Sequence, residues 1–493
     1  MLPDMREGDA TQLGVLEAAR ALRARELSAR ELLESCLTAI EERNGGEPTF
    51  DGAPDAVNAF ARVYADEART QADEADARLA REGGDAPPLC GIPIALKDLY
   101  SAAGHPVTAS SRVRADAPPA DRDSIAWARL RAAGMVLVGH THTHEFAAGG
   151  TTDQVGNPWA LDRTAGGSSG GSGAALAAGM VPATTGTDTC GSLRIPAALC
   201  GISALKPTHG RVPLGGILPL AATLDHAGPM ARSIADCAVL LDAMAAGGAE
   251  ISPLMPPPVP MGELPTSARP GPRPLQGVRI AVTPRVDIVE HEPDVGDGYE
   301  AARAAAESLG ATVVEVDHPG WLSGMDLNTI LLAEMIAHHV PYADRRDQYR
   351  ASIRELLELG GDGIPSEVYL AAQERRAAHT VAWEAWFAEH GVDALLEPSV
   401  PVVAQARGSG YDPGHLGGDG DPLIALTATW NLTGFPVAAF PSGLGARTGL
   451  PVGMSLVAPR GAEAPLVQIA VDLQEHALPP LEIVTEPRSA AAR

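Results

Sequence analysis

The chain has 493 residues, and its 37 lysines and arginines are outnumbered by 62 aspartates and glutamates, which gives a formal net charge of −25 at pH 7. Such a chain lacks the basic surface that contacts with nucleic-acid phosphates require, so we expect no nucleic-acid partner. It contains no run of about 18 apolar residues, and its first residues lack the layout of a secretory signal, so we expect no membrane partner and a cytoplasmic location.

Residues 1–85 are predicted to form a layer of helices. Apolar residues recur at helical spacing from residue 12 to residue 43, and Ser28 and Glu31 form a capping-box pattern that opens the second part of this stretch. A segment rich in Ala, Glu, Asp and Arg, at about 55–81, predicts a third helix with a solvated acidic face.

Between residues 86 and 246 the pattern changes to short apolar runs that are bounded by Gly and Pro and separated by helix-like stretches. The clearest of these runs are GIPIAL, GMVLVG and GMVPATTG, which begin at residues 91, 134 and 179. Because strand-like and helix-like segments alternate, this part of the chain is predicted to have an α/β fold.

Residues 247–276 are dense in proline and show no apolar periodicity, which predicts a linker or a long surface loop. A second αβ part, 277–493, follows. It begins with a strand-like run at 278–282, a helix near 298–308 and a second strand-like run at 312–316. A mostly helical stretch to about 390 and a closing region of short strands and turns complete the chain.

Residues 166–173 have the unusual sequence GGSSGGSG. A phosphate-binding loop is disfavoured because neither lysine of the chain follows a glycine. A nucleophile elbow, G-x-S-x-G, fits both Ser168 and Ser169, but it needs a strand directly before it, and NPWALDRTA at 157–165 is not strand-like. Taken alone, the segment fits a flexible Gly/Ser loop better than either of these motifs.

Only two of the 37 basic residues are lysines, Lys97 and Lys206. A lysine can lose its proton when it is desolvated and then act as a base, whereas an arginine effectively never does. Lys97, which follows an apolar run, therefore fits the role of a base. Lys206 fits a structural role better, with its ammonium group binding carbonyls or carboxylates.

The cysteines and one group of histidines could in principle bind a metal. The five cysteines are odd in number and lack C-x-x-C spacing, so we expect reduced thiols. His140, His142 and His144 would face one way on a strand. Because carboxylates with metal-binding spacing are missing beside them, we favour hydrogen-bonding roles for these histidines and expect no metal.

Three segments together resemble the amidase signature family, serine hydrolases that use a Ser-cisSer-Lys triad. They are GIPIALKD at 91–98, the stretch from 157 to 212, and LDHAGPMARSIADCAVLLDAM at 224–244. Weaker similarity at 431–444 and 449–457 extends the resemblance over nearly the whole chain. It implies an α/β/α sandwich with a central mixed β-sheet, formed by one large domain over 1–493, and no cofactor.

The resemblance also implies roles for individual residues. It places the nucleophile at Ser192, the cis-peptide serine at Ser168 and the base at Lys97, whose pKa must then be depressed by burial or by nearby positive charge. The residues implied to brace the active-site loops are Ser169, Asp188 and Arg194. The backbone amides implied to bind the oxyanion are those of Thr189, Cys190, Gly191 and Ser192.

Cys190 departs from the family pattern, because most members have glycine at this position. A cysteine can still donate its backbone N–H, provided that its dihedral angles do not require glycine. A thiol nucleophile at Cys190 is disfavoured, since the sequence places no histidine beside it.

We therefore expect an amidohydrolase that cleaves the C–N bond of a small-molecule carboxylic amide through an acyl-enzyme. Amides, ureas and carbamates remain open as substrates, and a homodimer is the default assembly. One alternative is the glutaminase subunit of a tRNA-dependent amidotransferase, which the region 330–400 does not resemble. Another is an inactive binding protein on the same scaffold, which the intact Lys97, Ser168 and Ser192 disfavour.

Overall fold

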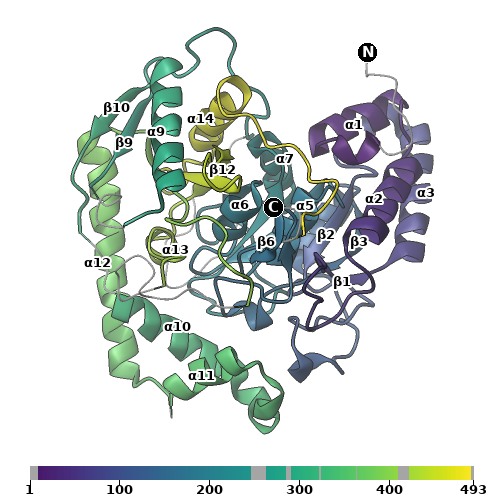
Figure 1. Ribbon diagram of the computed structural model, residues 1–493, viewed down its shortest axis with the longest axis horizontal. Helices are drawn as coiled ribbons and strands as arrows, with labels where there is room; N and C mark the ends of the chain where they lie inside the picture. The colour runs from purple at the N-terminus through teal and green to yellow at the C-terminus, as the bar shows by residue number, and fades with distance from the viewer. Residues whose placement is uncertain are drawn as a thin grey trace.

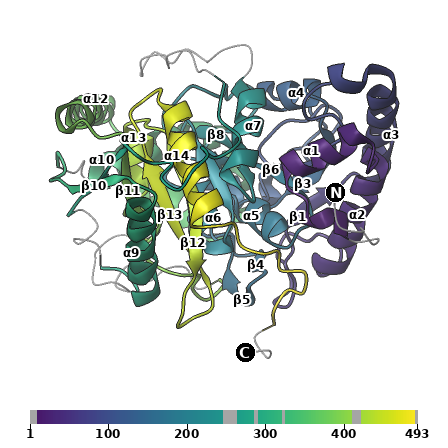
Figure 2. The same cartoon turned by 90° about the horizontal axis from the view of Figure 1, so that it is seen from above.

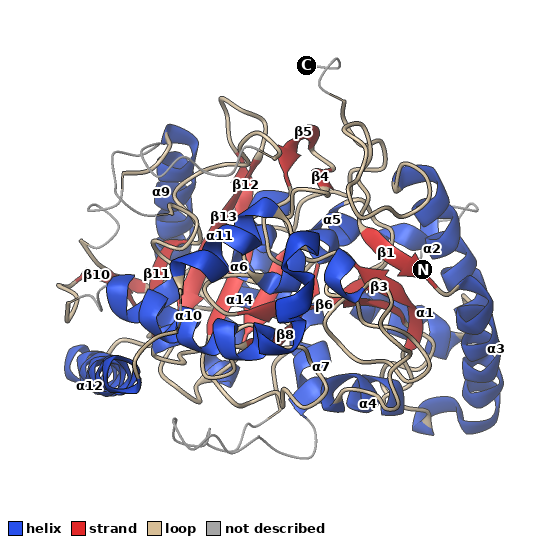
Figure 3. Cartoon of the chain, turned by 90° about the horizontal axis from the view of Figure 1, so that it is seen from below, coloured by secondary structure: helices blue, strands red, loops and turns tan. Residues whose placement is uncertain are grey.

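The computed structural model describes residues 9–245, 263–284, 290–320, 324–361, 363–408 and 421–489. Within these ranges, eleven strands form one mixed sheet that crosses the whole molecule (Figures 1 and 3). The strands are β1 (Phe60–Val63), β2 (Pro93–Lys97), β3 (Val136–Thr141), β6 (Ala183–Asp188), β7 (Ser203–Lys206), β8 (His226–Ala231), β9 (Arg279–Val282), β10 (Thr312–Glu315), β11 (Ala394–Pro398), β12 (Val437–Leu444) and β13 (Pro451–Val457).

The strand order is β1-β3-β2-β6-β8-β7-β12-β13-β11-β9-β10. Neighbours are parallel in the β3-β2-β6 and β11-β9-β10 groups and antiparallel elsewhere. Every residue of β2, β3, β6, β7 and β8 is buried, as expected for strands that are covered on both faces. The predicted mixed sheet is therefore confirmed.

Helices cover both faces of this sheet, which gives the predicted α/β/α sandwich (Figure 2). In one layer α5 packs on α6, and in the other α7 packs on α4 and α14. The helices are α1 (Val15–Ala24), α2 (Ala29–Arg43), α3 (Ala65–Glu82), α4 (Ile125–Ala132), α5 (Gly170–Ala177), α6 (Arg194–Cys200), α7 (Ile234–Ala245), α9 (Pro293–Ser308), α10 (Gly324–His339), α11 (Ala351–Leu359), α12 (Ser366–His390), α13 (Ala428–Leu432) and α14 (Glu463–His476).

The N-terminal helical layer, α1 to α3, lies at the β1 edge of the sheet (Figure 1). The capping box is confirmed, because the Glu31 amide donates to Ser28 Oγ and the Ser28 amide donates to the Glu31 carboxylate. The predicted third helix begins ten residues later than expected, at Ala65. Residues 60–63 instead form β1, because they pair with β3, a contact with a distant segment that local composition does not encode.

The C-terminal part contains a helix that the sequence analysis missed. Residues 463–476 form α14, where short strands and turns were expected. The signal was present, since the buried Leu466, Ile469, Ala470 and Leu473 recur at helical spacing. Residues 324–390 are mostly helical, as predicted.

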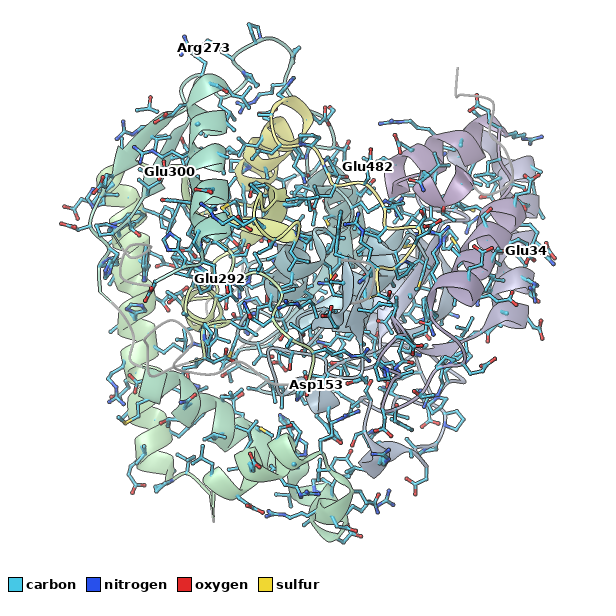
Figure 4. All side chains as sticks on the ribbon, in the orientation of Figure 1. Glu34, Asp153, Arg273, Glu292, Glu300 and Glu482 are labelled. Atoms are coloured by element: carbon cyan, nitrogen blue, oxygen red, sulfur yellow. The ribbon has the colours of Figure 1, made fainter. Side chains whose placement is uncertain are left out.

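The predicted proline-rich linker or loop, 247–276, lies partly outside the described residues, which resume at 263. From there to residue 278 the chain contains no helix or strand, but it is anchored to the core. Leu264 and Leu275 are buried, and the backbone and side chain of Arg269 both donate to Asp472 on α14. Charged side chains such as Glu34 on α2, Glu300 on α9 and Arg273 project at the periphery (Figure 4).

Candidate active site

The predicted site residues lie at the ends of elements in the middle of the sheet. Lys97 is the last residue of β2 and Asp188 is the last residue of β6, and these strands are parallel neighbours. Their carboxyl ends therefore meet at one edge, which is where open α/β sheets place their ligand sites. Ser168 and Ser192 precede α5 and α6, the two helices that pack on each other above this edge.

The amine of Lys97 is fully buried and contacts three hydroxyl groups. They belong to Ser168 at 2.7 Å, Ser169 at 2.9 Å and Thr187 at 2.8 Å, each measured from Nζ to the side-chain oxygen. The Ser169 hydroxyl also donates to the Thr187 carbonyl, at 3.3 Å. Its proton is therefore engaged elsewhere, and its oxygen is an acceptor for Lys97.

Burial lowers the pKa of Lys97 to about 7, against the opposing charges of Asp225 and Asp188, which raise it. An ammonium group in this position would be taken out of water without a carboxylate in direct contact. A neutral amine keeps a lone pair and can accept a proton. The predicted depression of the Lys97 pKa is thus present, and burial is its cause.

The backbone before Ser168 has the conformation that the resemblance implies. The peptide bond between Gly167 and Ser168 is cis, and the Ser168 carbonyl accepts hydrogen bonds from the His144 amide and the Thr152 hydroxyl. A side chain at Gly167 would collide with the carbonyl of Thr151. Glycine is therefore required here by close packing of the backbone.

The whole segment 166–173 is buried, so it is not a flexible loop. Residues 160–164 form the strand β5, which pairs with β4 (Gly156–Asn157) outside the main sheet, so the expectation that this stretch is not strand-like was wrong. Because Ser168 is fully buried and bonded to Lys97, it does not have the exposed position of an elbow nucleophile.

Ser192 is 6% exposed, whereas Ser168 and Lys97 are fully buried. It ends the turn 189–192, in which Gly191 has a φ of +139° that favours glycine. Cys190 is not among the residues with positive φ, so its backbone does not require glycine. Burial raises the pKa of the Cys190 thiol, which keeps the thiol protonated and disfavours it as a nucleophile.

Asp188 and Arg194 fix this turn through hydrogen bonds and a buried ion pair. The Asp188 carboxylate accepts hydrogen bonds from the amides of Gly191, at 2.7 Å, and Leu193, at 3.1 Å. The Arg194 guanidinium forms two 2.9 Å bonds with the same carboxylate, and both side chains are fully buried. Burial would raise the pKa of Asp188, but the charge and hydrogen bonds of Arg194 outweigh it and lower the pKa to about 2.

Two residues on the C-terminal side, which were not predicted from the sequence, complete this arrangement. Asn431, on α13, donates to the Asp188 carbonyl and carboxylate and accepts a bond from Arg194. Thr427 donates to the Cys190 carbonyl and accepts from Arg194 through its own carbonyl. Asn431 begins the NLTGFP segment of the weaker resemblance, which was the available signal.

Asp225 and Thr187 were also missed as site residues. Asp225 accepts hydrogen bonds from the Thr189 hydroxyl, at 2.6 Å, and from the amides of Leu220 and Ala221. Burial raises its pKa to about 6. Asp225 lies in the LDHAGP motif, so the sequence held a clue to it, whereas the hydroxyl of Thr187 faces Lys97 only because β2 and β6 are adjacent.

The three clustered histidines do not share a common site. His140 bonds to Tyr64 and to the Tyr100 carbonyl, while His142 contacts Ser110 and His144 contacts the Thr151 carbonyl. Only His140 lies on β3. Within the described ranges, no group of three or more His, Cys, Asp or Glu side chains could hold a metal ion.

The second lysine is structural, as expected. Lys206 is fully buried, and its amine donates to the carbonyls of Phe435, at 2.5 Å, and Pro207, at 3.3 Å. It thereby ties the end of β7 to the start of β12. Across the part of the chain that the structure describes, no helix combines the length and apolar composition needed to cross a bilayer.

Comparisons with known proteins show the family to which the chain belongs. A family model described as Amidase matches residues 50–467. A glutamyl-tRNA(Gln) amidotransferase subunit of Ralstonia nicotianae is 36% identical, and the alignment covers 92% of this chain and 95% of that protein. Our expectation that the region 330–400 sets the chain apart from such a subunit, which favoured a stand-alone amidase, is therefore not supported.

Two solved structures are similar over nearly their full length. The structure of 6-aminohexanoate cyclic dimer hydrolase with its substrate has a TM-score of 0.79 and 28% identity, with 97% of this chain and 99% of that chain covered. The peptide amidase of Stenotrophomonas maltophilia has a TM-score of 0.77 and 26% identity, with 97% and 98% covered. From its sequence and its fold, this chain is a member of the amidase family.

Proposed function

We propose that the protein hydrolyses the C–N bond of a carboxylic amide through an acyl-enzyme on Ser192, with Lys97 as the base and Ser168 as the proton relay. The contact between the buried Lys97 amine and Ser168 Oγ, at 2.7 Å, is the observation that carries this proposal. A lysine with a pKa of about 7 is half neutral at pH 7 and largely neutral above it, so it can accept a proton there.

The proton path follows from the contacts of Lys97. A neutral amine offers two donors and one lone pair, and the Ser169 oxygen accepts one of the donors. The lone pair then accepts the proton of Ser168, which takes the proton of Ser192 as the Ser192 oxygen bonds to the amide carbon. Ser168 then gives its proton to the leaving nitrogen as the C–N bond breaks, and it regains a proton from the Lys97 ammonium. In the second half of the reaction water loses a proton along Ser168 to Lys97 and attacks the acyl carbon. The C–O bond to Ser192 breaks, the carboxylate leaves, and the proton returns to the Ser192 oxygen.

The negative oxygen of the tetrahedral intermediate needs backbone donors. The amide of Gly191 is committed to Asp188, so in this proposal the amides of Thr189, Cys190 and Ser192 supply the donors. The Asp188 carboxylate, Thr427 and Asp225 hold the turn in place through Gly191, Cys190 and Thr189 respectively.

Covalent labelling tests the nucleophile. A fluorophosphonate should form one adduct per folded chain, located by peptide mass spectrometry at Ser192, and Ser192→Ala should abolish it. Ser35→Ala, on the surface helix α2, serves as the matched control and should label like the wild type. An adduct at Cys190 would refute the proposed acyl-enzyme. So would the absence of any adduct in protein that is folded by circular dichroism.

The pH dependence tests the base. Because Lys97 must be neutral and burial sets its pKa to about 7, kcat/KM should fall by roughly tenfold per pH unit below pH 7 and reach a plateau above pH 8. Asp225 raises the pKa of Lys97, so Asp225→Asn should move this limb to lower pH. A limb that stays in place in Asp225→Asn, or activity that is flat from pH 5 to pH 8, would argue against Lys97 as the base.

A second candidate is the glutaminase role within a tRNA-dependent amidotransferase. The 36% identity with a glutamyl-tRNA(Gln) amidotransferase subunit over almost the whole chain favours it. The chemistry at Ser192 would be the same, but the amide would be glutamine and the released ammonia would serve an amidotransferase. Steady-state assays with L-glutamine and with simple amides, run on the isolated chain, distinguish the two roles.

A further inference from the structure

One side of the Ser192 turn is built from apolar side chains. Cys190 is half-buried and packs against an apolar cluster together with three other half-buried residues, Leu331, Tyr369 and Ile424. We call these four side chains the Cys190 wall. The buried cluster behind the wall consists of Ala221, Leu224, Leu327, Ile330, Ala372, Ala428 and Leu432.

The wall is tied directly to the turn that holds Ser192. Thr427, at the start of α13, donates to the Cys190 carbonyl, and a side chain at Gly191 would collide with the same Thr427 hydroxyl. Ile424 lies three residues before Thr427 in the sequence, and its carbonyl accepts a hydrogen bond from the Ala428 amide. Cys190, two residues before Ser192, therefore packs against the same apolar cluster as Leu331 of α10 and Tyr369 of α12.

Among the described residues, the charged side chains Glu334, Arg376 and Asp421 near the wall each have hydrogen-bond partners. Glu334 accepts from the Thr223 hydroxyl and amide and from the Tyr369 hydroxyl. The Arg376 guanidinium donates to Thr223 and to the Leu432 carbonyl, and Asp421 accepts from the Leu423 amide. Arg194 is bound to Asp188, so neither arginine is offered to a substrate carboxylate.

We propose, on the basis of the acyl-enzyme function above, that the Cys190 wall binds the acyl group of the substrate and selects an uncharged, apolar one. The leaving nitrogen must face Ser168 to receive its proton, so the acyl chain extends to the other side of the carbonyl, along the turn. An apolar chain gains free energy by leaving water against such a wall. The four side chains of the wall carry no charge that could pair with the ammonium or the carboxylate of glutamine, so these groups would lose hydration against it.

The test measures kcat/KM for acetamide, butanamide, hexanamide and L-glutamine with the isolated full chain. We expect kcat/KM to rise by roughly fourfold per added methylene up to hexanamide, and L-glutamine to be the poorest substrate. Leu331→Asn should reduce the ratio of hexanamide to acetamide by at least about tenfold. Leu356→Asn, the same change at a half-buried leucine of α11 outside the wall, should leave that ratio unchanged.

A second measurement separates the wall from the reaction. The rate of Ser192 labelling should be higher for a hexyl than for a methyl fluorophosphonate, and Leu331→Asn should remove the difference. If labelling depends on chain length but no amide is turned over, the proposed amidase function would be refuted. The proposal that the Cys190 wall binds an apolar chain would stand. A preference for L-glutamine, or labelling rates that ignore chain length, would refute the wall and leave the acyl-enzyme intact.

Discussion

Replacing Lys97 by methionine is expected to lower kcat for amide hydrolysis at pH 8 by about 10²- to 10⁴-fold, which is the range that a general base contributes. Methionine fills a similar volume in the buried site but has no basic nitrogen. Ser168 then has no acceptor for its proton, and Ser192 remains a poorly nucleophilic hydroxyl. Lys97→Arg should be equally inactive, since its guanidinium does not give up a proton at this pH.

Lys206 provides the matched control for this change. It is the second lysine of the chain and is equally buried, but its amine binds backbone carbonyls. Lys206→Met should therefore reduce the free energy of unfolding, by about 1–3 kcal/mol for an unpaired carbonyl, while the folded fraction keeps its kcat. If Lys97→Met retained a tenth of the wild-type kcat with normal circular dichroism, Lys97 would not be the base.

Replacing Arg194 by methionine is expected to reduce the free energy of unfolding by about 3–5 kcal/mol, because it leaves the fully buried Asp188 carboxylate without its charge partner. The pKa of Asp188 should then rise from about 2, since the charge that lowers it is gone. The loss of stability should be largest at neutral pH and smaller under acid conditions, where a protonated Asp188 needs no partner. Urea unfolding at pH 5 and pH 8 measures both effects.

A surface ion pair gives the comparison. Arg78→Met breaks an i,i+4 pair with Glu82 in which both side chains are partly exposed, and it should change the free energy of unfolding by less than about 0.5 kcal/mol. Asp188→Asn combined with Arg194→Met should recover part of the stability lost in Arg194→Met, because no unpaired charge remains. Equal losses in the Arg78 and Arg194 variants would contradict this account of the buried pair.

Local patterns predicted the elements that local physics controls. The Ser28–Glu31 capping box and the runs that became β2, β3 and β6 were recognisable, because their signals lie within a few residues. β1 was hidden in a helix-like composition, since it exists only by pairing with β3. The missed helix α14 was a failure of a different kind, because its apolar spacing was present in the sequence.

The site residues also fall into those that the sequence indicated and those that only the fold brings together. Lys97 is one of only two lysines in the chain, which pointed to a role as a base. In the structure its burial lowers its pKa to about 7, as that role requires. Thr187 and Asn431 could not be found by spacing, because each reaches the site across the sheet or from the far part of the chain. The Gly191 amide donates to Asp188 because of the direction in which its N–H points. The residue types in the sequence do not determine that direction.

The bonds from Asn431 to Asp188 join residues that are 243 positions apart. Contacts between residues so far apart in sequence form slowly, because closing a large loop costs chain entropy before the contact contributes any stabilisation. We therefore expect the turn that carries Ser192 to be completed only after α13, which carries Asn431, has docked against it. During refolding, helical circular dichroism should return before the reactivity of Ser192, so that a newly made chain acquires its nucleophile only at the last stage of assembly.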